Sequence, residues 1–356
     1  MILKRLRLTN FRSYPSLDLE FGEGANLILG SNASGKTNLA EAIFYLSLTR
    51  SWRTLEEKNL IRFGEESASI QAFVQEGSLH REISIELTPQ GKRVFLNGKP
   101  VRKLSELSRV VNVLLFSPED VRLFEGPPSE RRAFLDVSLS KRSSDYLALI
   151  ARQSALLKSR NALLKDGARD AALLDVITAQ LIEVQEPIVR YRTMYVTSLN
   201  AVLPNVLAAL RGQKAPCSIV YRSFAKDDGS FKANAEKAYR DALESDILHR
   251  STSVGVHRED FALRLNGKDV AEFGSQGENR MCALALKLSP FFLIEEAERK
   301  PICVLDDVTS ELDADNAGRL LQYLSELGQS FVTATNLSLQ GASVIEVADH
   351  NALRRN

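Results

Sequence analysis

An eight-residue segment near the start of the chain constrains the fold more than any other feature. It matches the pattern G-x-x-x-x-G-K-T and consists of Gly30, Ser31, Asn32, Ala33, Ser34, Gly35, Lys36 and Thr37. Such a pattern makes a phosphate-binding loop where a buried strand enters it and a helix leaves it. Residues 25–29 are an apolar run and residues 37–48 have helical periodicity, so both flanking elements are predicted.

Each part of this loop suits a nucleoside triphosphate. Glycines let the backbone curl so that successive N–H groups point at phosphates, and the helix N-terminus adds its dipole. We expect Lys36 to neutralise the β- and γ-phosphates and the Thr37 hydroxyl to ligate Mg²⁺. Asn38 follows directly and belongs to the predicted binding segment. The expected cofactors are therefore ATP and Mg²⁺.

A second motif lies near the other end of the chain. The four apolar residues 302–305 precede Asp306 and Asp307, which predicts a central strand that ends in carboxylates beside the phosphate loop. Asp306 is expected to hold Mg²⁺, and Asp307 to orient the attacking water. Lys36, Asp306 and Asp307 are thus the predicted catalytic residues.

A third motif, at Ser275, Gln276 and Gly277, stands at a predicted helix start shortly before that strand. A simple P-loop kinase requires no Ser-x-Gly helix start there, and the separation of Lys36 from Asp306 is very long. Both features resemble the ABC-type ATPases, and among them the heads of the SMC and Rad50 group. The resemblance implies that this helix start touches the γ-phosphate held by a second copy of the protein. The alternative is an ordinary capped helix with a serine turn.

The chain changes character twice along its length. Strand-like segments alternate with helices up to residue 120, helix formers dominate residues 128–211, and strands return from residue 261. We predict an α/β fold: a P-loop ABC-ATPase-type head with a mixed sheet and helices, lobe I, made by residues 1–120 and 255–356. A mostly helical lobe II is predicted as an insert at residues 121–254. A bundle and a coiled-coil hairpin both stay open for its long helices.

The individual elements follow from periodicity and turn residues. Strands are predicted at 2–8, 25–29, 68–74, 80–87, 93–96, 261–265, 302–305, 330–334 and 343–347, and a further apolar run lies at 110–116. Helices are predicted at 37–48, 143–165, 170–203, 233–248, 277–297 and 315–327, and a further helix start at 117–120. The pairs Asn97-Gly98 and Asn266-Gly267 predict hairpin turns.

The composition of the chain limits the functions and the cellular compartments that it fits. The net charge is +1, so binding of nucleic acid would need a local basic patch. Cys217, Cys282 and Cys303 are odd in number and far apart, which favours a reducing compartment over a disulfide or zinc site. No run approaches the roughly 18 apolar residues that span a bilayer, and the basic N-terminus does not resemble a signal peptide. We expect a cytoplasmic protein with no membrane partner.

Longer segments resemble the bacterial RecF proteins. They are NFRSY at 10–14, the loop with residues 38–42, FSPED at 116–120, PSERR at 128–132, VHRED at 256–260 and VLDDVTSELD at 304–313, and the resemblance reaches to about residue 340. It implies an ATPase of recombinational repair that dimerises on ATP, binds double-stranded and gapped DNA, and hydrolyses ATP slowly. It also implies action with RecO and RecR to load RecA at single-strand gaps. In related heads the segment matching 10–13 lies near the nucleotide, so Arg12 is a predicted ATP contact.

Several positions depart from the pattern of these ATPases. Glu278 stands where the signature usually has Gln, and Asp307 stands where many ABC ATPases have a longer Glu. Residues 333–336 (TATN) replace the switch histidine, and no lobe-linking Gln is evident near residues 116–118. The weakened catalytic positions predict a switch and not a motor. The alternatives are another SMC-like or OLD-type ATPase of DNA metabolism, an ABC transporter ATPase subunit, and a scaffold that holds ATP only for structure.

Weaker candidates have both a structural and a functional interpretation. His257 is either a core histidine or a ligand or DNA contact. Arg131 and Arg132 are either phosphate contacts or partners of Glu130 or Asp136. Arg50 and Arg53 flank Trp52, which is either a DNA contact or, more commonly, a partly buried tryptophan with basic neighbours. Lys4, Arg5 and Arg7 on the first strand have no assigned partner.

Overall fold

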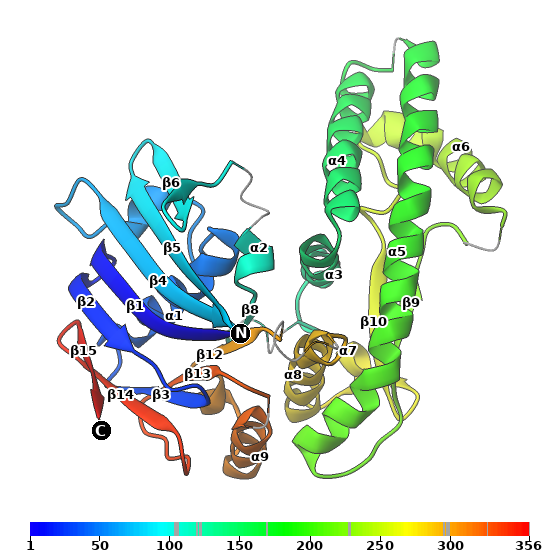
Figure 1. The fold of residues 1–356 in the computed structure, drawn as a ribbon. Helices are drawn as coiled ribbons and strands as arrows, with labels where there is room; N and C mark the ends of the chain where they lie inside the picture. The colour runs from blue at the N-terminus through cyan, green and yellow to red at the C-terminus, as the bar shows by residue number, and fades with distance from the viewer. Residues whose placement is uncertain are drawn as a thin grey trace. The chain divides into compact units, whose positions relative to one another are not determined.

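The computed structural model describes residues 1–102, 107–118, 120, 123–168, 170–226, 229–294, 296, 300–325 and 327–355. The chain forms two compact units (Figure 1). Unit 1 contains Met1–Arg122, Asn205–Lys214 and Ala283–Asn356, and unit 2 contains Leu123–Pro204 and Ala215–Cys282.

The described strands, in chain order, are β1 Ile2–Phe11, β2 Tyr14–Glu20, β3 Ala25–Leu29, β4 Ala68–Glu76, β5 Leu79–Thr88, β6 Gly91–Leu96, β7 Lys99–Pro100, β8 Val113–Phe116, β9 Cys217–Arg222, β10 Asp260–Leu265, β11 Lys268–Asp269, β12 Ile302–Asp306, β13 Ser330–Ala334, β14 Ser343–Ala348 and β15 Asn351–Arg355. The described α-helices are α1 Lys36–Leu48, α2 Leu107–Val110, α3 Pro128–Arg142, α4 Ser144–Lys165, α5 Ala171–Arg211, α6 Phe231–His249, α7 Val270–Phe273, α8 Gln276–Phe292 and α9 Ala314–Ser325. Short 3-10 helices, η1 Glu57–Leu60 and η5 Val308–Glu311, complete the description.

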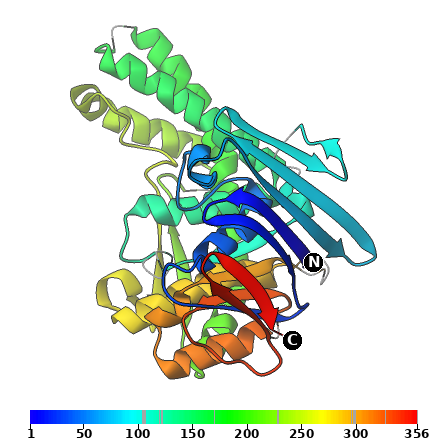
Figure 2. The same ribbon diagram turned by 90° about the vertical axis from the view of Figure 1, so that its left-hand side faces the viewer.

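Unit 1 contains two sheets. The first is antiparallel, with the strand order β2-β1-β4-β5-β6-β7. The second has the order β15-β14-β3-β13-β12-β8, and all its neighbours run parallel except β14 and β15. Figure 2 shows β15 beside β2, where the two sheets approach each other and pack.

Helix α1 is buried between these two sheets. Its apolar residues share one hydrophobic core with Leu6 of β1 and Ile85 of β5 on one side and with Val304 of β12 and Phe331 of β13 on the other. A helix covered on both sides needs apolar residues all round and not in a single stripe. This packing fixes the N-terminus of α1, and hence the phosphate loop before it.

The strand order of the parallel sheet brings distant motifs together. β3 leads into the phosphate loop and β12 ends in Asp306, and β13 lies between them. Parallel strands end at the same sheet edge, where open α/β sheets bind their ligands. The predicted α/β head with its helical insert is confirmed.

Unit 2 is mostly helical, with α4 and α5 side by side in Figure 1. It also contains a three-stranded sheet of order β11-β10-β9. The Asn200 side chain of α5 exchanges two hydrogen bonds with the backbone of Ile219 in β9, at 2.6 and 2.9 Å. The backbone groups of this edge strand that Asn200 holds are not available for pairing with another chain.

The predicted lobe boundary at residue 254 differs from the unit boundary. Residues 255–282 group with unit 2, because β10 pairs along its whole length with β9. Residues 205–214, placed in lobe II, group with unit 1, where Arg319 donates to the Leu210 carbonyl at 3.1 Å. Whether the units act as two lobes stays a prediction.

Three predicted segments differ most from the described elements. The run at 110–116 divides into the end of α2 and the strand β8, and the helix predicted at 277–297 ends at Phe292. Tighter i−3 bonds from Leu293 and Ile294 close its last turn. The helix predicted at 170–203 continues to Arg211 through Pro204. The predicted helix start at 117–120 includes Glu119, which lies outside the described residues.

Helix α5 corrects the expectation that no segment resembles a membrane span. In length and composition it is apolar enough to cross a bilayer. Core helices of soluble proteins show the same property. Arg192 lies inside α5 and is held by two carboxylates, as a charge in a protein core must be.

Candidate functional site: a phosphate loop and two carboxylates

The phosphate loop is shaped by two glycines that no other residue could replace. A Cβ on Gly30 would lie 2.3 Å from the Val347 carbonyl oxygen of β14, which is backbone and cannot move aside. Gly35 has φ 116°, and a Cβ there would lie 2.9 Å from the Tyr14 hydroxyl. That hydroxyl donates to the Gly35 carbonyl at 3.0 Å. β14 and β2 thus hold the loop in its curled form.

Lys36 points back over the loop. Its Nζ donates to the carbonyls of Gly30 and Ser31, each at 2.7 Å. Burial lowers the pKa of Lys36, and the nearby carboxylates of Asp307 and Asp306 oppose that shift. The ammonium therefore lies at the centre of the loop, where it can pair with phosphate oxygens. The buried Ser34 hydroxyl in the same loop has no partner within the described chain, which leaves it available to a bound group.

Three hydroxyl and carboxyl groups meet next to Lys36. Thr37 Oγ1 at the start of α1 donates to Asp306 Oδ1 at 3.0 Å, and Thr333 Oγ1 of β13 donates to the same oxygen at 2.9 Å. Burial raises the pKa of Asp306, and the hydrogen bonds from Thr333 and Thr37 oppose the rise. The structure thus brings together the loop and the Asp306 motif, which are far apart in sequence. Thr333 was named only as part of the segment that replaces a histidine.

Asp307 leaves the strand in a left-handed conformation. Its φ is 52°, which is rare for residues other than glycine and is found most often in active sites and tight turns. Its backbone N–H donates to Thr333 Oγ1 at 2.9 Å, and its carbonyl accepts from the Ser310 hydroxyl at 2.7 Å. Neighbouring groups therefore fix the turn that aims the Asp307 side chain.

The donors present fit Mg²⁺. Mg²⁺ takes oxygen ligands, keeps several waters, and is usually held by one or two carboxylates together with substrate phosphates. Thr37 and Asp306 would hold it here, and it would supply charge neutralisation for phosphoryl transfer. Among the described residues no cluster of three or more His, Cys, Asp or Glu side chains forms a complete metal cage.

Arg12 is tied to the helix that follows the loop. Its guanidinium forms two hydrogen bonds with Glu41 of α1, at 2.7 and 2.8 Å, and Glu41 is fully buried. Arg53 also pairs with Glu41 at 3.2 Å and donates to Asn38 at 2.8 Å, and Asn38 donates to the Ser13 hydroxyl. The sequence reasoning missed Glu41, although a carboxylate inside an apolar helix is itself a signal of buried partners.

The Ser-x-Gly helix start lies in unit 2 and forms a capping box. Ser275 Oγ accepts from the Glu278 N–H at 3.2 Å, and Glu278 Oε2 accepts from the Ser275 N–H at 3.1 Å. This reciprocal pair is the usual cap of an S-x-x-E sequence. A Cβ added to Gly277 would meet none of the described atoms within 4 Å. Packing inside the chain therefore gives no reason for a glycine at this exposed position.

Most of the weaker candidates have internal partners. Arg131 makes two hydrogen bonds to Asp260, at 2.8 and 2.9 Å, and Arg132 donates to the Glu259 carbonyl. Neither Glu130 nor Asp136, the partners weighed from the sequence, holds Arg131. The half-buried His257 ring faces the Thr252 carbonyl, 3.1 Å from Nε2, which supports its structural interpretation.

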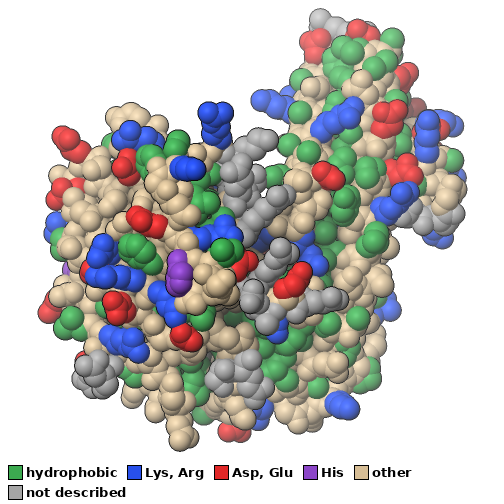
Figure 3. All heavy atoms as spheres, viewed as in Figure 1, with side chains coloured by type: hydrophobic (Ala, Val, Ile, Leu, Met, Phe, Trp, Pro, Cys, Tyr) green, Lys and Arg blue, Asp and Glu red, His purple; other side chains and the backbone are tan. Residues whose placement is uncertain are grey.

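The remaining basic candidates are also largely accounted for. Lys4, Arg5 and Arg7 pair with Glu23 and Asp18 on the surface of the antiparallel sheet. Figure 3 shows Lys and Arg interspersed with Asp and Glu on this face, so no single sign of charge dominates it. Trp52 packs edge-to-face on Phe44, and the three cysteines are buried and free.

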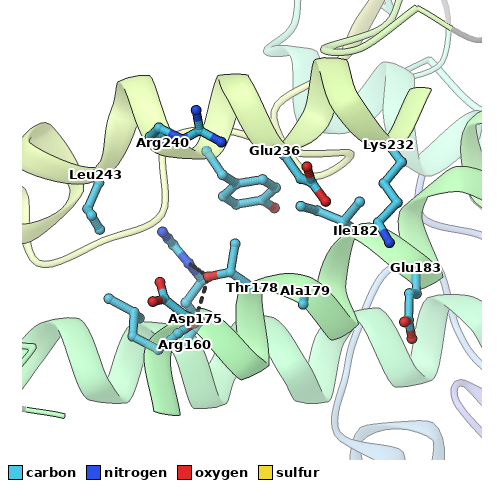
Figure 4. Close-up of a pocket in the computed structure, with 12 residues that line it drawn as sticks. Arg160, Asp175, Thr178, Ala179, Ile182, Glu183, Lys232, Glu236, Arg240 and Leu243 are labelled. Carbon is cyan, nitrogen blue, oxygen red and sulfur yellow. Dashed lines mark hydrogen bonds between the residues drawn. The ribbon is translucent and has the colours of Figure 1, made fainter. Parts of the chain in front are cut away.

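A cavity of about 270 Å³ lies between α4, α5 and α6 in unit 2 (Figure 4). Arg160, which lines the cavity, donates hydrogen bonds to Asp246, Thr252 and Thr178 at 2.7 to 3.0 Å. Charges of both signs line it, including Asp175, Lys232 and Arg240. None of the predicted site residues lies there.

Comparison with known proteins agrees with this geometry. Residues 2–350 match the model of the RecF/RecN/SMC N-terminal domain family. The DNA replication and repair protein RecF of Lactobacillus johnsonii is 36% identical over 348 residues, which cover 95% of this chain and 93% of that protein. The corresponding protein of Lactobacillus gasseri is 37% identical over 349 residues, with the same coverage.

Solved structures extend the comparison to the fold. A structure of the recombination mediator protein RecF with ATP has a TM-score of 0.89 at 32% identity, and the match covers 100% of this chain and 98% of that one. The SMC head domain of Pyrococcus furiosus has a TM-score of 0.60 at 16% identity, covering 99% and 96%, which reflects a shared fold alone. On sequence and fold together, this chain belongs to the RecF family.

Proposed function

We propose that this chain is an ATP-gated DNA-binding protein of recombinational repair. ATP binds at residues 30–38 with Mg²⁺ held by Thr37 and Asp306, and two copies close over two nucleotides. The arrangement of Thr37, Asp306 and Thr333 beside Lys36 is the observation that supports it most directly. The similarity to a RecF protein solved with ATP supports the choice of nucleotide.

The proposed dimer uses Ser275, Gln276 and Gly277 of one copy against the nucleotide of the other. The exposed, unobstructed Gly277 supports this, because a bare backbone at a helix N-terminus can approach a phosphate closely. Contacts to the γ-phosphate then exist only in the closed dimer, so ATP stabilises the dimer and loss of that phosphate weakens it.

DNA is the proposed cargo of the closed dimer, in double-stranded or gapped form. RecF structures described as part of the RecFOR pathway support RecO and RecR as partners in loading RecA. We propose a cytoplasmic location and a weak, DNA-stimulated ATPase that times release. The short side chain of Asp307 and the absence of a switch histidine from residues 333–336 support slow turnover.

Light scattering tests the proposal by measuring dimer formation. The parent protein is compared with ATP and with ADP, and the Asp307→Asn variant is measured in the same way. We expect a dimer with ATP only, and a longer-lived one in Asp307→Asn, because the attacking water loses its base. The matched control is Asp315→Asn, which removes an exposed carboxylate in the first turn of α9. A monomer under all conditions would contradict the proposed ATP-dependent switch.

Gapped DNA separates the alternatives. The proposal requires that gapped DNA strengthens the binding of ATP or accelerates its hydrolysis. A flat response to DNA in a protein that hydrolyses ATP rapidly would favour a transporter-type subunit, and a flat response with bound, unhydrolysed ATP would favour a scaffold.

A further inference from the structure

Thr333 occupies the strand between the two halves of the nucleotide site. It is in register with Asp306 across the parallel pair of β13 and β12, so the two side chains lie on the same face of the sheet. The Thr333 side chain is fully buried. Its surroundings therefore decide which hydrogen bonds its hydroxyl makes.

The single hydroxyl of Thr333 serves both carboxylate residues. It has one proton, which it donates to Asp306 Oδ1 at 2.9 Å, and its oxygen accepts the Asp307 N–H, also at 2.9 Å. The first bond orients the carboxylate expected to hold the metal. The second holds the backbone of Asp307 at φ 52°, a conformation that needs support from its surroundings.

We infer that Thr333 is the positioning residue that sets Asp306 and Asp307 relative to each other for ATP hydrolysis. This inference rests on the proposed function, because it needs ATP and a metal at the loop. Hydrogen-bonded partners behind a metal-binding carboxylate typically change metal affinity or activity by about 10- to 100-fold when removed. Valine has the shape of threonine without the hydroxyl, so Thr333→Val removes both bonds at once.

The experiment compares Thr333→Val, Thr333→Ser and Ser330→Ala. Ser330 lies in the same strand with a buried hydroxyl that has no partner among the described residues, so its loss is the matched control. Binding of a fluorescent ATP analogue is measured with Mg²⁺ and with EDTA. Phosphate release gives kcat and KM, and thermal denaturation shows whether each variant is folded.

In Thr333→Val we expect kcat to fall about 10- to 100-fold. We also expect Mg²⁺ to increase the affinity for ATP less than it does in the parent. The affinity for ATP in EDTA should be unchanged. Thr333→Ser should keep kcat within about threefold of the parent, since it retains the hydroxyl. Ser330→Ala should match the parent.

Two outcomes would overturn the inference alone: a Thr333→Val protein with the parent's kcat, or a Thr333→Ser protein as impaired as Thr333→Val. If Thr333→Val does not fold, Thr333→Ala, which is smaller and also lacks the hydroxyl, takes its place in the same comparison with the same expected losses. A parent chain that binds no ATP would instead overturn the proposed function, and the inference with it.

Discussion

Glu278 Oε2 accepts hydrogen bonds from both the backbone N–H and the hydroxyl of Ser275, each at 3.1 Å. The carboxylate that stands where the signature usually has Gln is therefore turned back onto the helix cap.

This relationship predicts that Glu278→Gln will be nearly neutral in stability, since glutamine also completes a capping box. Ser275→Ala removes the cap and should cost about 1 kcal/mol of unfolding free energy. Urea denaturation measures both. If Glu278→Gln lost as much unfolding free energy as Ser275→Ala, this account of Glu278 in the cap would be contradicted.

Gly277→Ala should separate folding from assembly. Because no described atom lies within 4 Å of the added Cβ, stability should stay unchanged or rise by up to about 1 kcal/mol, the usual gain from glycine to alanine in a helix. ATP-dependent dimerisation should weaken, since the methyl group occupies the approach to the other copy's nucleotide. Light scattering and denaturation on the same sample check both parts.

Gly30→Ala is the contrasting case. Its Cβ would collide with the Val347 carbonyl of the same unit, so ATP binding by the monomer itself should be lost. A fluorescent ATP analogue measures this directly. Wild-type affinity in Gly30→Ala would mean that the loop is less constrained than its geometry indicates.

Arg192 holds two carboxylates inside unit 2. Its guanidinium pairs with Asp136 at 2.8 Å and with the fully buried Glu259 at 2.7 Å. Removing one partner of a buried ion pair typically costs about 3–5 kcal/mol, so we expect Arg192→Met to lose about that much in chemical denaturation. The matched control is Arg190→Met on the same helix, whose exposed pair with Glu186 should contribute under about 0.5 kcal/mol.

His257 should make stability depend on pH. Burial lowers the pKa of His257, and the hydrogen bond with the Thr252 backbone opposes that shift. The charges of Arg258 and Arg132 lower the pKa further, and Asp246 has a smaller opposing effect. Between that lowered pKa and about 6.5, the usual value, the unfolded chain binds a proton that the folded chain does not. Stability should therefore fall as the pH falls below about 6.5, by up to about 1.4 kcal/mol per pH unit.

Denaturation of His257→Gln between about pH 5 and 7 tests this, since the variant should show a shallower slope. His80→Gln, which changes an exposed histidine, should keep the parent's slope. The same slope in all three proteins would contradict the assignment.

Most of the secondary structure could be predicted from the sequence, because most helices, strands and turns are determined by residues close together in the chain. The strand, loop and helix around residues 25–48 follow from periodicity and glycine spacing, and the Asn97-Gly98 and Asn266-Gly267 turns adopt positive φ as such pairs favour. Of the missed strands, β9 pairs with β10, which follows only after helix α6, so its pairing depends on a partner distant in sequence. β2 and β15 pair with the strands directly before them, β1 and β14, without an Asn-Gly or Asp-Gly pair between the strands to indicate the turn.

Tertiary packing explains the remaining differences. α5 continues past Pro204, where an interior proline costs about 3 kcal/mol, because Val206, Leu207 and Leu210 beyond it are buried. For the site, the chemistry of Lys36, Thr37 and Asp306 was predictable from motifs. The double role of Thr333 was not, because it depends on which strand lies between two others.

The strand order β14-β3-β13 has a consequence for how the protein is made. Both neighbours of β3 come from the last part of the chain, and roughly 300 residues separate Leu29 from Ser330. At about 5–20 residues per second, a ribosome needs on the order of 15–60 s to add them. During that interval the nascent chain can complete β1, β2, β4, β5 and β6 of the antiparallel sheet, whereas β3 waits unpaired. A nascent chain that stalls late in synthesis would therefore display an apolar strand and a half-built nucleotide loop to chaperones.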